Sequence, residues 1–371
     1  MPKKVHILIS GGGTGGHIFP AIAIANAIKD KLAEADIQFV GAIGRMEMEK
    51  VPLAGYPITG LWISGLQRKL TTKNILFPVK VMSSIFKAYQ IINKFKPDVV
   101  IGTGGYASGP LLYVASKKNI PTLIHEQNAF PGITNKLLGK SVSKICVSYP
   151  NMQKYFSKDK ITLTGNPIRK EIIKLSPTKK ESLDFFKLGN DKKTLLIIGG
   201  SQGAKQVNIA VAKNLQTIQD LNLQVVWQTG SGSKHIAEEA TKGNKNIIVT
   251  EFIQEMDKAY VAADFIISRA GAIAIAEIVA AKKPAIFIPL PSAAEDHQTK
   301  NAKTLVDGDA ALLINENNAI NELPVTLKLL VEDTKRQKTI IKNLNKFSYP
   351  DAAGTIANEV IKLIKTNNES S

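Results

Sequence analysis

The sequence predicts an α/β protein of two domains, each built on a parallel β-sheet that helices cover on both faces. Short, continuously apolar runs alternate with stretches of helical periodicity along the chain, and such runs are typical of strands buried in parallel sheets. The chain has 371 residues, of which 44% are apolar, whereas one domain usually holds about 100–200 residues. Two cores of similar size are therefore expected.

The predicted strands form two sets of five. The first set lies at 5–10, 37–43, 98–102, 122–126 and 144–148, and the second at 194–200, 223–230, 247–252, 264–271 and 284–290. Few strand signals occur between 149 and 193, so we expect the linker near 166–190. The predicted domains are residues 1–166 and 167–348, and the segment 351–365 predicts a last helix within 349–371.

Charge and composition narrow the class of partner. The net charge is +17, and residues 1–168 carry most of it, with 21 Lys and Arg against 8 Asp and Glu. An anionic partner of the first domain is therefore expected. Only 6% of residues are aromatic, which disfavours a nucleic acid bound by base stacking. The single cysteine, Cys146, excludes a disulfide scaffold and a Cys-rich metal site, and it is consistent with a reducing cytosol.

No segment reads as a membrane span or a signal peptide. The uncharged stretches 5–28 and 99–116 are interrupted by glycines and a proline, and the apolar run that follows Lys3 and Lys4 is too short for a signal-peptide core. We therefore expect the chain to stay in the cytoplasm.

A basic, apolar segment points to a membrane surface. Residues 51–97 contain seven Lys and Arg and no acidic residue, interleaved with aliphatic and aromatic side chains. This mixture is typical of a segment that rests on an anionic leaflet, and we assign that role to residues 68–87. The alternative is an ordinary core helix with a solvated Lys face, because Met82, Ile85, Tyr89 and Ile92 recur at helical spacing.

Glycine loops follow several predicted strands. The first, at 11–16, precedes a helix that opens near Pro20, so free backbone N–H groups are expected to hold a phosphate or an oxyanion. The same loop matches the dinucleotide fingerprint, yet no carboxylate ends the second strand, so a nicotinamide or flavin oxidoreductase is disfavoured. A P-loop is also disfavoured, because Thr134 stands where its first glycine is required.

Further polar loops end other predicted strands, at 102–110, 125–128 and 199–204. Ligands of open parallel sheets bind at the carboxyl ends of the strands. The sequence therefore predicts two Rossmann-like domains with binding loops at those ends.

At the level of motifs, the chain resembles the peptidoglycan glycosyltransferases that add N-acetylglucosamine to undecaprenyl-diphospho-muramoylpentapeptide (lipid I), forming lipid II. The motifs are GGTGGHIFPA (12–21), GTGGYASGP (102–110), HEQNAFPGITNK (125–136), TGNPIR (164–169), GGSQGA (199–204), EFIQEM (251–256), RAGA (269–272) with Glu277, and HQTKNA (297–302). So many ordered motifs at strand ends are more specific than any glycine pattern.

The resemblance implies a glycosyltransferase B fold, in which two Rossmann-like domains face a cleft and the C-terminal helix returns to the first domain. It implies an inverting, metal-independent transfer from UDP-N-acetylglucosamine, with no cofactor. The first domain would bind lipid I and the cytoplasmic face of the inner membrane, and the second the UDP-sugar. A transferase for another lipid acceptor, such as diacylglycerol, and a UDP-sugar epimerase remain alternatives within the same fold.

Matching positions imply the donor site in the second domain. Arg169 and Ser201 would face the diphosphate, and the Ile253 backbone the uracil. Glu277 would accept hydrogen bonds from both ribose hydroxyls, and as a lone carboxylate in an apolar helix it needs a partner. The start of that helix, with Ala272 and Ile273, would face the diphosphate with its positive end, and Gln298 would contact the sugar hydroxyls.

In the first domain, the matching positions are Thr14, Gly15, Gly16 and Asn128, which would close over the donor or reach the acceptor. Inversion needs a base for the acceptor hydroxyl, and the two candidates are His17 and Glu126. The chain departs from the family pattern at three alanines, so donor contacts through side-chain hydroxyls are not expected there. These alanines are Ala270, Ala274 and Ala276.

Overall fold

The computed structural model describes residues 4–65, 75–200 and 203–369. The chain divides into two compact units, one formed by Met1–Ile168 with Asp351–Ser371 and the other by Arg169–Pro350. The chain passes from the first unit to the second at Ile168–Arg169, inside the expected linker 166–190. Most of that range belongs to the second unit, where it forms α6 (Lys170–Ile173) and α7 (Lys179–Phe185). These helices escaped prediction because they are short and rich in lysine.

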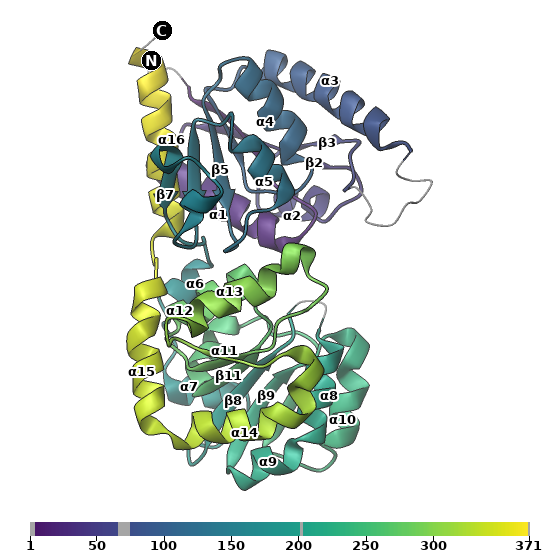
Figure 1. Cartoon of the computed structure of the whole chain (residues 1–371), viewed down its shortest axis with the longest axis vertical. Coiled ribbons are helices and arrows are strands. Elements are labelled where there is room, and N and C mark those ends of the chain that lie inside the picture. The colour runs from purple at the N-terminus through teal and green to yellow at the C-terminus, as the bar shows by residue number, and fades with distance from the viewer. Residues whose placement is uncertain (1–3, 66–74, 201–202, 370–371) are drawn as a thin grey trace. The chain divides into compact units, whose positions relative to one another are not determined.

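The first unit has a seven-stranded sheet in the order β3-β2-β1-β4-β5-β6-β7 (Figure 1). All neighbours are parallel. Its strands are β1 (His6–Ser10), β2 (Asp36–Ala42), β3 (Ile58–Leu61), β4 (Val99–Gly102), β5 (Thr122–Glu126), β6 (Lys144–Val147) and β7 (Ile161–Leu163). The five central strands were predicted. The edge strands β3 and β7 were missed because each is short and only partly buried.

Helices cover both faces of this sheet, since successive strand residues point to opposite sides. Ile7 and Ile9 of β1 pack in one apolar cluster with α1 and α16, whereas Leu8 packs in another with α3 and α4. The helices of this unit are α1 (Gly15–Lys31), α2 (Glu47–Leu53), α3 (Phe77–Phe95), α4 (Ser108–Lys117), α5 (Ile133–Leu138) and α16 (Ala352–Glu369). The return of the C-terminal helix to the first domain is thereby confirmed.

The second unit has a six-stranded parallel sheet in the order β10-β9-β8-β11-β12-β13. Its strands are β8 (Lys193–Ile198), β9 (Leu223–Gln228), β10 (Ile247–Thr250), β11 (Phe265–Ser268), β12 (Ala285–Phe287) and β13 (Leu312–Leu313). Only β13, an edge strand of two residues, was not predicted. Its other helices are α8 (Lys205–Lys213), α9 (Leu215–Asp220), α10 (Lys234–Ala240), α11 (Met256–Ala262), α12 (Ala272–Ala280), α13 (His297–Val306), α14 (Ala319–Glu332) and α15 (Thr334–Leu344).

Both sheets reverse their strand order beside their first strand, since β1 lies between β2 and β4 and β8 between β9 and β11. In open parallel sheets this switch point creates a crevice at the carboxyl ends of the strands, where ligands bind. The fold thus places the loops after β1 and β8 at the expected ligand edge of each unit. Among the described residues, no helix is long and apolar enough to cross a membrane.

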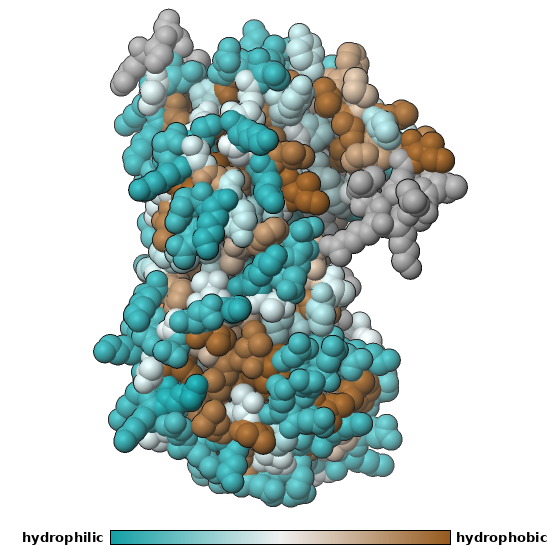
Figure 2. Space-filling view, viewed as in Figure 1, coloured by the Kyte–Doolittle hydropathy of each residue, from teal (hydrophilic) through white to brown (hydrophobic). Residues whose placement is uncertain are grey.

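Helix α3 packs one side on the core, where Val81, Ile85, Ile91 and Phe95 are partly buried, and leaves large apolar side chains exposed on the other side. It buries only Ser84, Ala88 and Ile92, whereas Met82 and Phe86 are 66% and 63% exposed. The sequence alternative, a core helix facing inward through Met82, Ile85, Tyr89 and Ile92, is wrong for Met82 and Tyr89, which are exposed, whereas Ile92 is buried and Ile85 packs against the core. Figure 2 shows the resulting apolar surface over α3. Arg68, Lys69 and Lys73 of the basic segment lie outside the described residues.

Candidate active site

The glycine loop after β1 uses its first N–H groups internally. Gly12 N–H donates to Gly104 O at 3.4 Å, and Gly13 N–H donates to Glu47 Oε2 at 3.0 Å. The expectation of free N–H groups is thus wrong for these two residues. At the start of α1, no described residue accepts a hydrogen bond from the backbone N–H of Thr14, Gly15 or Gly16. These three N–H groups lie at the positive end of a 17-residue helix, an arrangement that can hold an anion.

Glu47 lies directly beneath the glycine loop, and sequence reasoning missed it. Its side chain is fully buried, Oε1 accepts from Ala42 N–H at 3.0 Å, and Oε2 accepts from Gly13 N–H. A Cβ atom on Gly12 would lie 2.1 Å from Oε1, so glycine is required there by the carboxylate itself. The signal in the sequence was Glu47 itself, a carboxylate shortly after the second predicted strand. A carboxylate had been expected only at the end of that strand.

His17 lies in the first turn of α1 and is held on two sides. Its Nδ1 lies 3.0 Å from Gln127 Oε1, and its backbone carbonyl accepts from Thr103 Oγ1 at 2.8 Å. The imidazole packs on the backbone of Gly104, where φ is +99° and a Cβ atom would approach Nδ1 to 2.8 Å. Among the described residues, Nε2 of His17 has no hydrogen-bond partner, and the side chain is partly exposed.

A buried polar chain continues behind His17. Gln127 Nε2 lies 3.0 Å from His125 Nδ1, and His125 Nε2 donates to Gly165 O at 3.1 Å. Asn166 Nδ2 donates to the Gln127 carbonyl at 3.0 Å. Burial lowers the pKa of His125 to about 4, so this ring is neutral near pH 7. His125 therefore links Gln127 to the backbone at Gly165.

Glu126 is engaged in structural hydrogen bonds. It is 1% exposed. Oε1 accepts from the backbone and side-chain amides of Asn128 at 3.0 and 3.2 Å, and Oε2 accepts from Gly132 N–H at 3.1 Å and Asn135 Nδ2 at 2.8 Å. Each oxygen of this buried carboxylate therefore accepts two hydrogen bonds from the protein. The geometry favours His17 over Glu126 as the candidate base.

In the second unit, Arg169 and Glu277 form a bidentate ion pair. Arg169 Nε donates to Oε1 at 2.9 Å and Nη2 to Oε2 at 3.0 Å. Tyr260 donates to Oε2 at 3.1 Å, and burial together with the Glu277 charge raises the pKa of Tyr260 well above its usual value. The partner that the apolar surroundings of Glu277 required is therefore Arg169, with Tyr260. The sequence expectation treated Arg169 and Glu277 as separate contacts.

Gln298 hydrogen-bonds the loops that follow β11 and β12. Its Oε1 accepts from Leu290 N–H at 2.9 Å and from Ala270 N–H at 3.3 Å, and Asn301 Nδ2 donates to Ala270 O at 3.4 Å. The side-chain oxygen is therefore occupied by backbone donors, which corrects the expectation that it is open to a sugar. Contact with hydroxyls would use Nε2.

The loop before α12 is braced by Arg269, which sequence reasoning did not select. Arg269 is buried, and its guanidinium donates to the carbonyls of Ile288 and Pro289 at 3.0 Å and to Glu316. Its position directly after a buried strand was the available signal. Gly271 caps α12 in an extended conformation, which places Ala272 and Ile273 in the first turn of the helix.

Ile253 and Ser201 are the two remaining candidates for the UDP-sugar site. Ile253 is buried, and its N–H donates to Gln228 Oε1 at 3.1 Å. Only its backbone carbonyl is therefore left for a hydrogen bond to uracil. Gln228 Nε2 in turn donates to Gly200 O at 3.0 Å. Ser201 lies outside the described residues.

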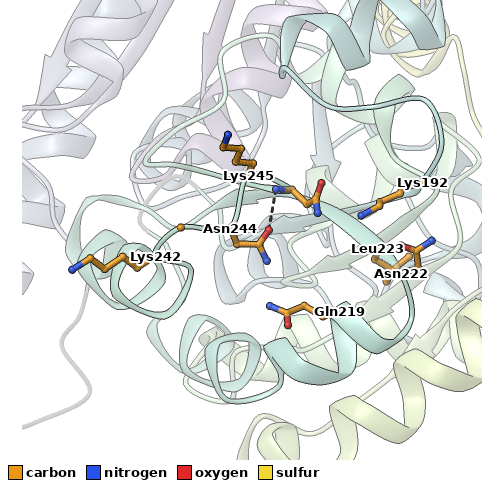
Figure 3. Close-up of a pocket in the computed structure, with 9 residues that line it drawn as sticks. Lys192, Gln219, Asn222, Leu223, Lys242, Asn244 and Lys245 are labelled. Carbon is orange, nitrogen blue, oxygen red and sulfur yellow. Dashed lines mark hydrogen bonds between the residues drawn. The ribbon is translucent and has the colours of Figure 1, made fainter.

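A cavity of about 590 Å³ lies in the second unit at the amino ends of the strands, away from the loops described above (Figure 3). Lys192, Leu223 and Asn246 line it, and they stand at the amino ends of β8, β9 and β10. None of the predicted site residues lines this cavity.

Two units with parallel sheets and polar loops at the carboxyl ends of their strands are the architecture of the glycosyltransferase B fold. Residues 7–147 match the glycosyltransferase family 28 N-terminal domain, and residues 194–356 match the family 28 C-terminal domain. The chain belongs to glycosyltransferase family 28.

Named relatives extend over nearly the whole chain. A UDP-N-acetylglucosamine–N-acetylmuramyl-(pentapeptide) pyrophosphoryl-undecaprenol N-acetylglucosamine transferase of Flavobacterium psychrophilum is 48% identical over 98% of this chain and 99% of its own. The enzyme of the same name from Christiangramia forsetii is 47% identical, with coverage of 98% and 99%. The crystal structure of MurG from Acinetobacter baumannii superimposes with a TM-score of 0.78 at 27% identity, covering 96% of this chain and 99% of that one. The family predicted from the motifs is confirmed.

Proposed function

We propose that the protein transfers N-acetylglucosamine from UDP-N-acetylglucosamine to the 4-hydroxyl of the muramoyl sugar of lipid I, forming lipid II for peptidoglycan synthesis. The relatives that carry this name are nearly half identical over almost the full chain. The structural observation that carries the proposal is His17, a partly exposed imidazole beside free helix N–H groups, with Nδ1 bonded and Nε2 open among the described residues. This arrangement suits a base acting next to a phosphorylated ligand.

The proposed reaction is a single displacement. His17 Nε2 takes the proton of the acceptor hydroxyl as its oxygen bonds to the anomeric carbon. The bond from that carbon to the UDP oxygen breaks, and UDP leaves with the electron pair. Attack opposite the leaving group inverts the anomeric configuration, through an oxocarbenium-like transition state. No metal takes part in the proposed step.

The second unit would hold the donor. The amino end of α12, with Ala272 and Ile273, supplies partial positive charge for the diphosphate, together with Arg169 and Ser201. Glu277 would accept from the ribose hydroxyls, the Ile253 carbonyl would face the uracil, and Gln298 Nε2 would face the sugar. Because Arg169 and Glu277 bond each other, donor binding requires them to separate or to share their partners.

The first unit would hold the acceptor and the membrane. The N–H groups of Thr14, Gly15 and Gly16, with Asn128, are proposed to bind phosphate or sugar groups of the substrates. The exposed apolar face of α3 is proposed to rest on the anionic cytoplasmic leaflet of the inner membrane. Support comes from Met82 and Phe86, which are exposed, and from Lys80 and Lys87 on the same helix. The protein would thus be a peripheral membrane enzyme of the cytoplasm.

The test is UDP release by the purified protein from UDP-N-acetylglucosamine, in EDTA, with and without a lipid I analogue that has a shortened prenyl chain. Release that requires the analogue, and persists in EDTA, is expected. Donor binding without release would move the acceptor to another lipid, and loss of activity in EDTA would contradict the metal-free step. His17→Ala should abolish release while leaving donor affinity unchanged.

A further inference from the structure

Gln127 connects the candidate base to the core of the first unit. It is 1% exposed and follows β5 directly. Its Oε1 lies 3.0 Å from His17 Nδ1, and its Nε2 donates to Thr103 O at 2.8 Å. The side-chain amide therefore bonds the Thr103 backbone through its nitrogen and the His17 imidazole through its oxygen.

The orientation of this amide follows from its carbonyl neighbours. Thr103 O at 2.8 Å and His125 O at 3.3 Å both lie beside the same terminal atom of Gln127. A carbonyl oxygen only accepts hydrogen bonds, so that atom is the NH₂ group. The atom that faces His17 is consequently the amide oxygen, which only accepts.

His125 supports the same direction of hydrogen bonding. Its Nε2 donates to Gly165 O at 3.1 Å, so in the neutral ring Nδ1 accepts, and it lies 3.0 Å from Gln127 Nε2. Burial keeps His125 neutral, with a pKa of about 4. Asn166 Nδ2 donates to the backbone carbonyl of Gln127 at 3.0 Å and so holds the main chain. If the side-chain amide turned over, its oxygen would face Thr103 O and His125 Nδ1, which both accept, and the hydrogen bonds to them would be lost.

We propose that Gln127 is a positioning residue for the transfer, because it holds neutral His17 as the Nδ1–H tautomer and so leaves the Nε2 lone pair for the acceptor hydroxyl. The inference rests on the proposed role of His17 as the base. An unconstrained neutral imidazole populates both tautomers, with the Nε2–H form in the majority, and that form has no lone pair at Nε2. The hydrogen bond at one ring nitrogen decides which nitrogen carries the proton.

Two further features fit this role. The backbone of Gly104 packs against the His17 ring at Nδ1, which restricts rotation of the ring away from Gln127. After Nε2 takes the proton, the amide oxygen still accepts from Nδ1–H and stabilises the imidazolium. A carboxylate does the same for histidine in serine hydrolases; here the partner is a neutral amide.

The direct test is the tautomer of His17 in the ¹⁵N-labelled full-length protein, from long-range ¹H–¹⁵N correlations assigned with a His17→Gln variant. We expect a protonated Nδ1 and an unprotonated Nε2 in the wild-type protein at a pH where His17 is neutral. A wild-type ring protonated at Nε2 overturns the proposal without any variant of Gln127.

Variants of Gln127 give the kinetic test. Gln127→Leu removes the acceptor, so the Nε2–H form should dominate and kcat should fall on the order of 10²-fold, within the usual range for general-base catalysis. The KM for UDP-N-acetylglucosamine should stay within about 2-fold, since Gln127 does not contact the donor in this proposal. Gln127→Glu retains an acceptor for Nδ1–H, so it should keep the tautomer and move the acidic limb of kcat/KM to higher pH. Gln153→Leu, at an exposed position of the same unit, is the matched control and should match the wild-type protein.

The outcomes separate this inference from the proposed function. If His17→Ala is inactive while a folded Gln127→Leu keeps the wild-type kcat, the positioning role is wrong and the base assignment stands. If His17→Ala retains turnover, the base assignment fails, and with it the role of Gln127 in transfer. If the wild-type protein does not act on the lipid I analogue, the proposed function fails whatever tautomer is measured.

Discussion

At the residue scale, the site is a set of buried polar groups that satisfy one another. Gly13 donates to Glu47, His17 bonds Gln127, and Glu126 accepts from four donors in the following loop and in α5. Buried polar atoms are costly without partners, so these bonds fix the loops at the strand ends. The residues with open polar atoms are then the ones available to substrates.

The Arg169–Glu277 pair makes the first prediction at this scale. Glu277→Gln should weaken UDP-N-acetylglucosamine binding about 10-fold or more, because charge-assisted hydrogen bonds contribute about 1.5–3 kcal/mol each. Titration calorimetry measures the change. Glu171→Gln, an exposed carboxylate in α6, should leave affinity unchanged, and an unaltered Kd in Glu277→Gln would exclude Glu277 from the donor site.

His125 makes a prediction about pH. Its pKa is about 4 in the folded protein, against 6.5 for the unperturbed group, so folding favours the neutral ring. Below pH 6.5 the unfolded chain takes up a proton that the folded chain does not. The free energy of unfolding therefore falls as the pH falls from 6.5 towards 4, by at most about 1.4 kcal/mol per pH unit.

Urea unfolding at several pH values checks this prediction. His125→Asn removes the titrating group, so its free energy of unfolding should depend less on pH than that of the wild-type protein across the same window. Other groups contribute equally to both proteins. Parallel curves for the two proteins would show that His125 does not titrate as described.

At the element scale, α3 behaves as a surface helix with an uncovered apolar side. Ala88 and Ile92 on its inner side are buried, and Ile85 packs against the same cluster. Met82, Phe86 and Tyr89 are exposed. Lys80 lies 5.7 Å from the Trp62 ring, which places a cation beside another exposed aromatic side chain. Membrane-surface segments combine these two properties.

The double variant Met82→Ser and Phe86→Ser should release the protein from anionic vesicles. Each exposed side chain contributes roughly 1.5–3 kcal/mol when it is buried in an apolar phase, so the partition coefficient should fall at least 10-fold in a sedimentation assay. UDP binding should not change, because the donor site lies in the other unit in this proposal. Val325→Ser, an exposed apolar position of α14, is the control, and equal release by both proteins would refute the assignment to α3.

At the scale of the whole molecule, the chain leaves the first unit at Ile168 and returns to it at Asp351. The returning helix α16 completes the core, because Ile356 and Val360 are fully buried in the cluster that contains Ile18 and Ile24 of α1. The first unit is therefore made from both ends of the chain, and the second from its middle.

This organisation predicts where a core substitution in α16 acts. Ile356→Ala should destabilise the first unit by about 2–5 kcal/mol, through lost burial and a residual cavity. Hydrogen exchange should accelerate in peptides from β1 and α1 and stay unchanged in those from β8 and β9. The exposed position Lys365→Ala is the control. Acceleration in β8 and β9 alone would show that α16 does not stabilise the first unit.

The sequence by itself determined ten of the thirteen strands of the described residues, the glycine loops and the family, because apolar periodicity, glycine and ordered motifs are local properties. The edge strands β3, β7 and β13 and the short Lys-rich helices escaped, since short or partly buried segments weaken that pattern. Only the tertiary structure decided which polar atoms are engaged in hydrogen bonds within the protein. Gly13 and Glu47 are 34 residues apart, His17 and Gln127 are 110, and Arg169 and Glu277 are 108. Such partners meet only when parallel strands bring their carboxyl ends to one edge of a sheet.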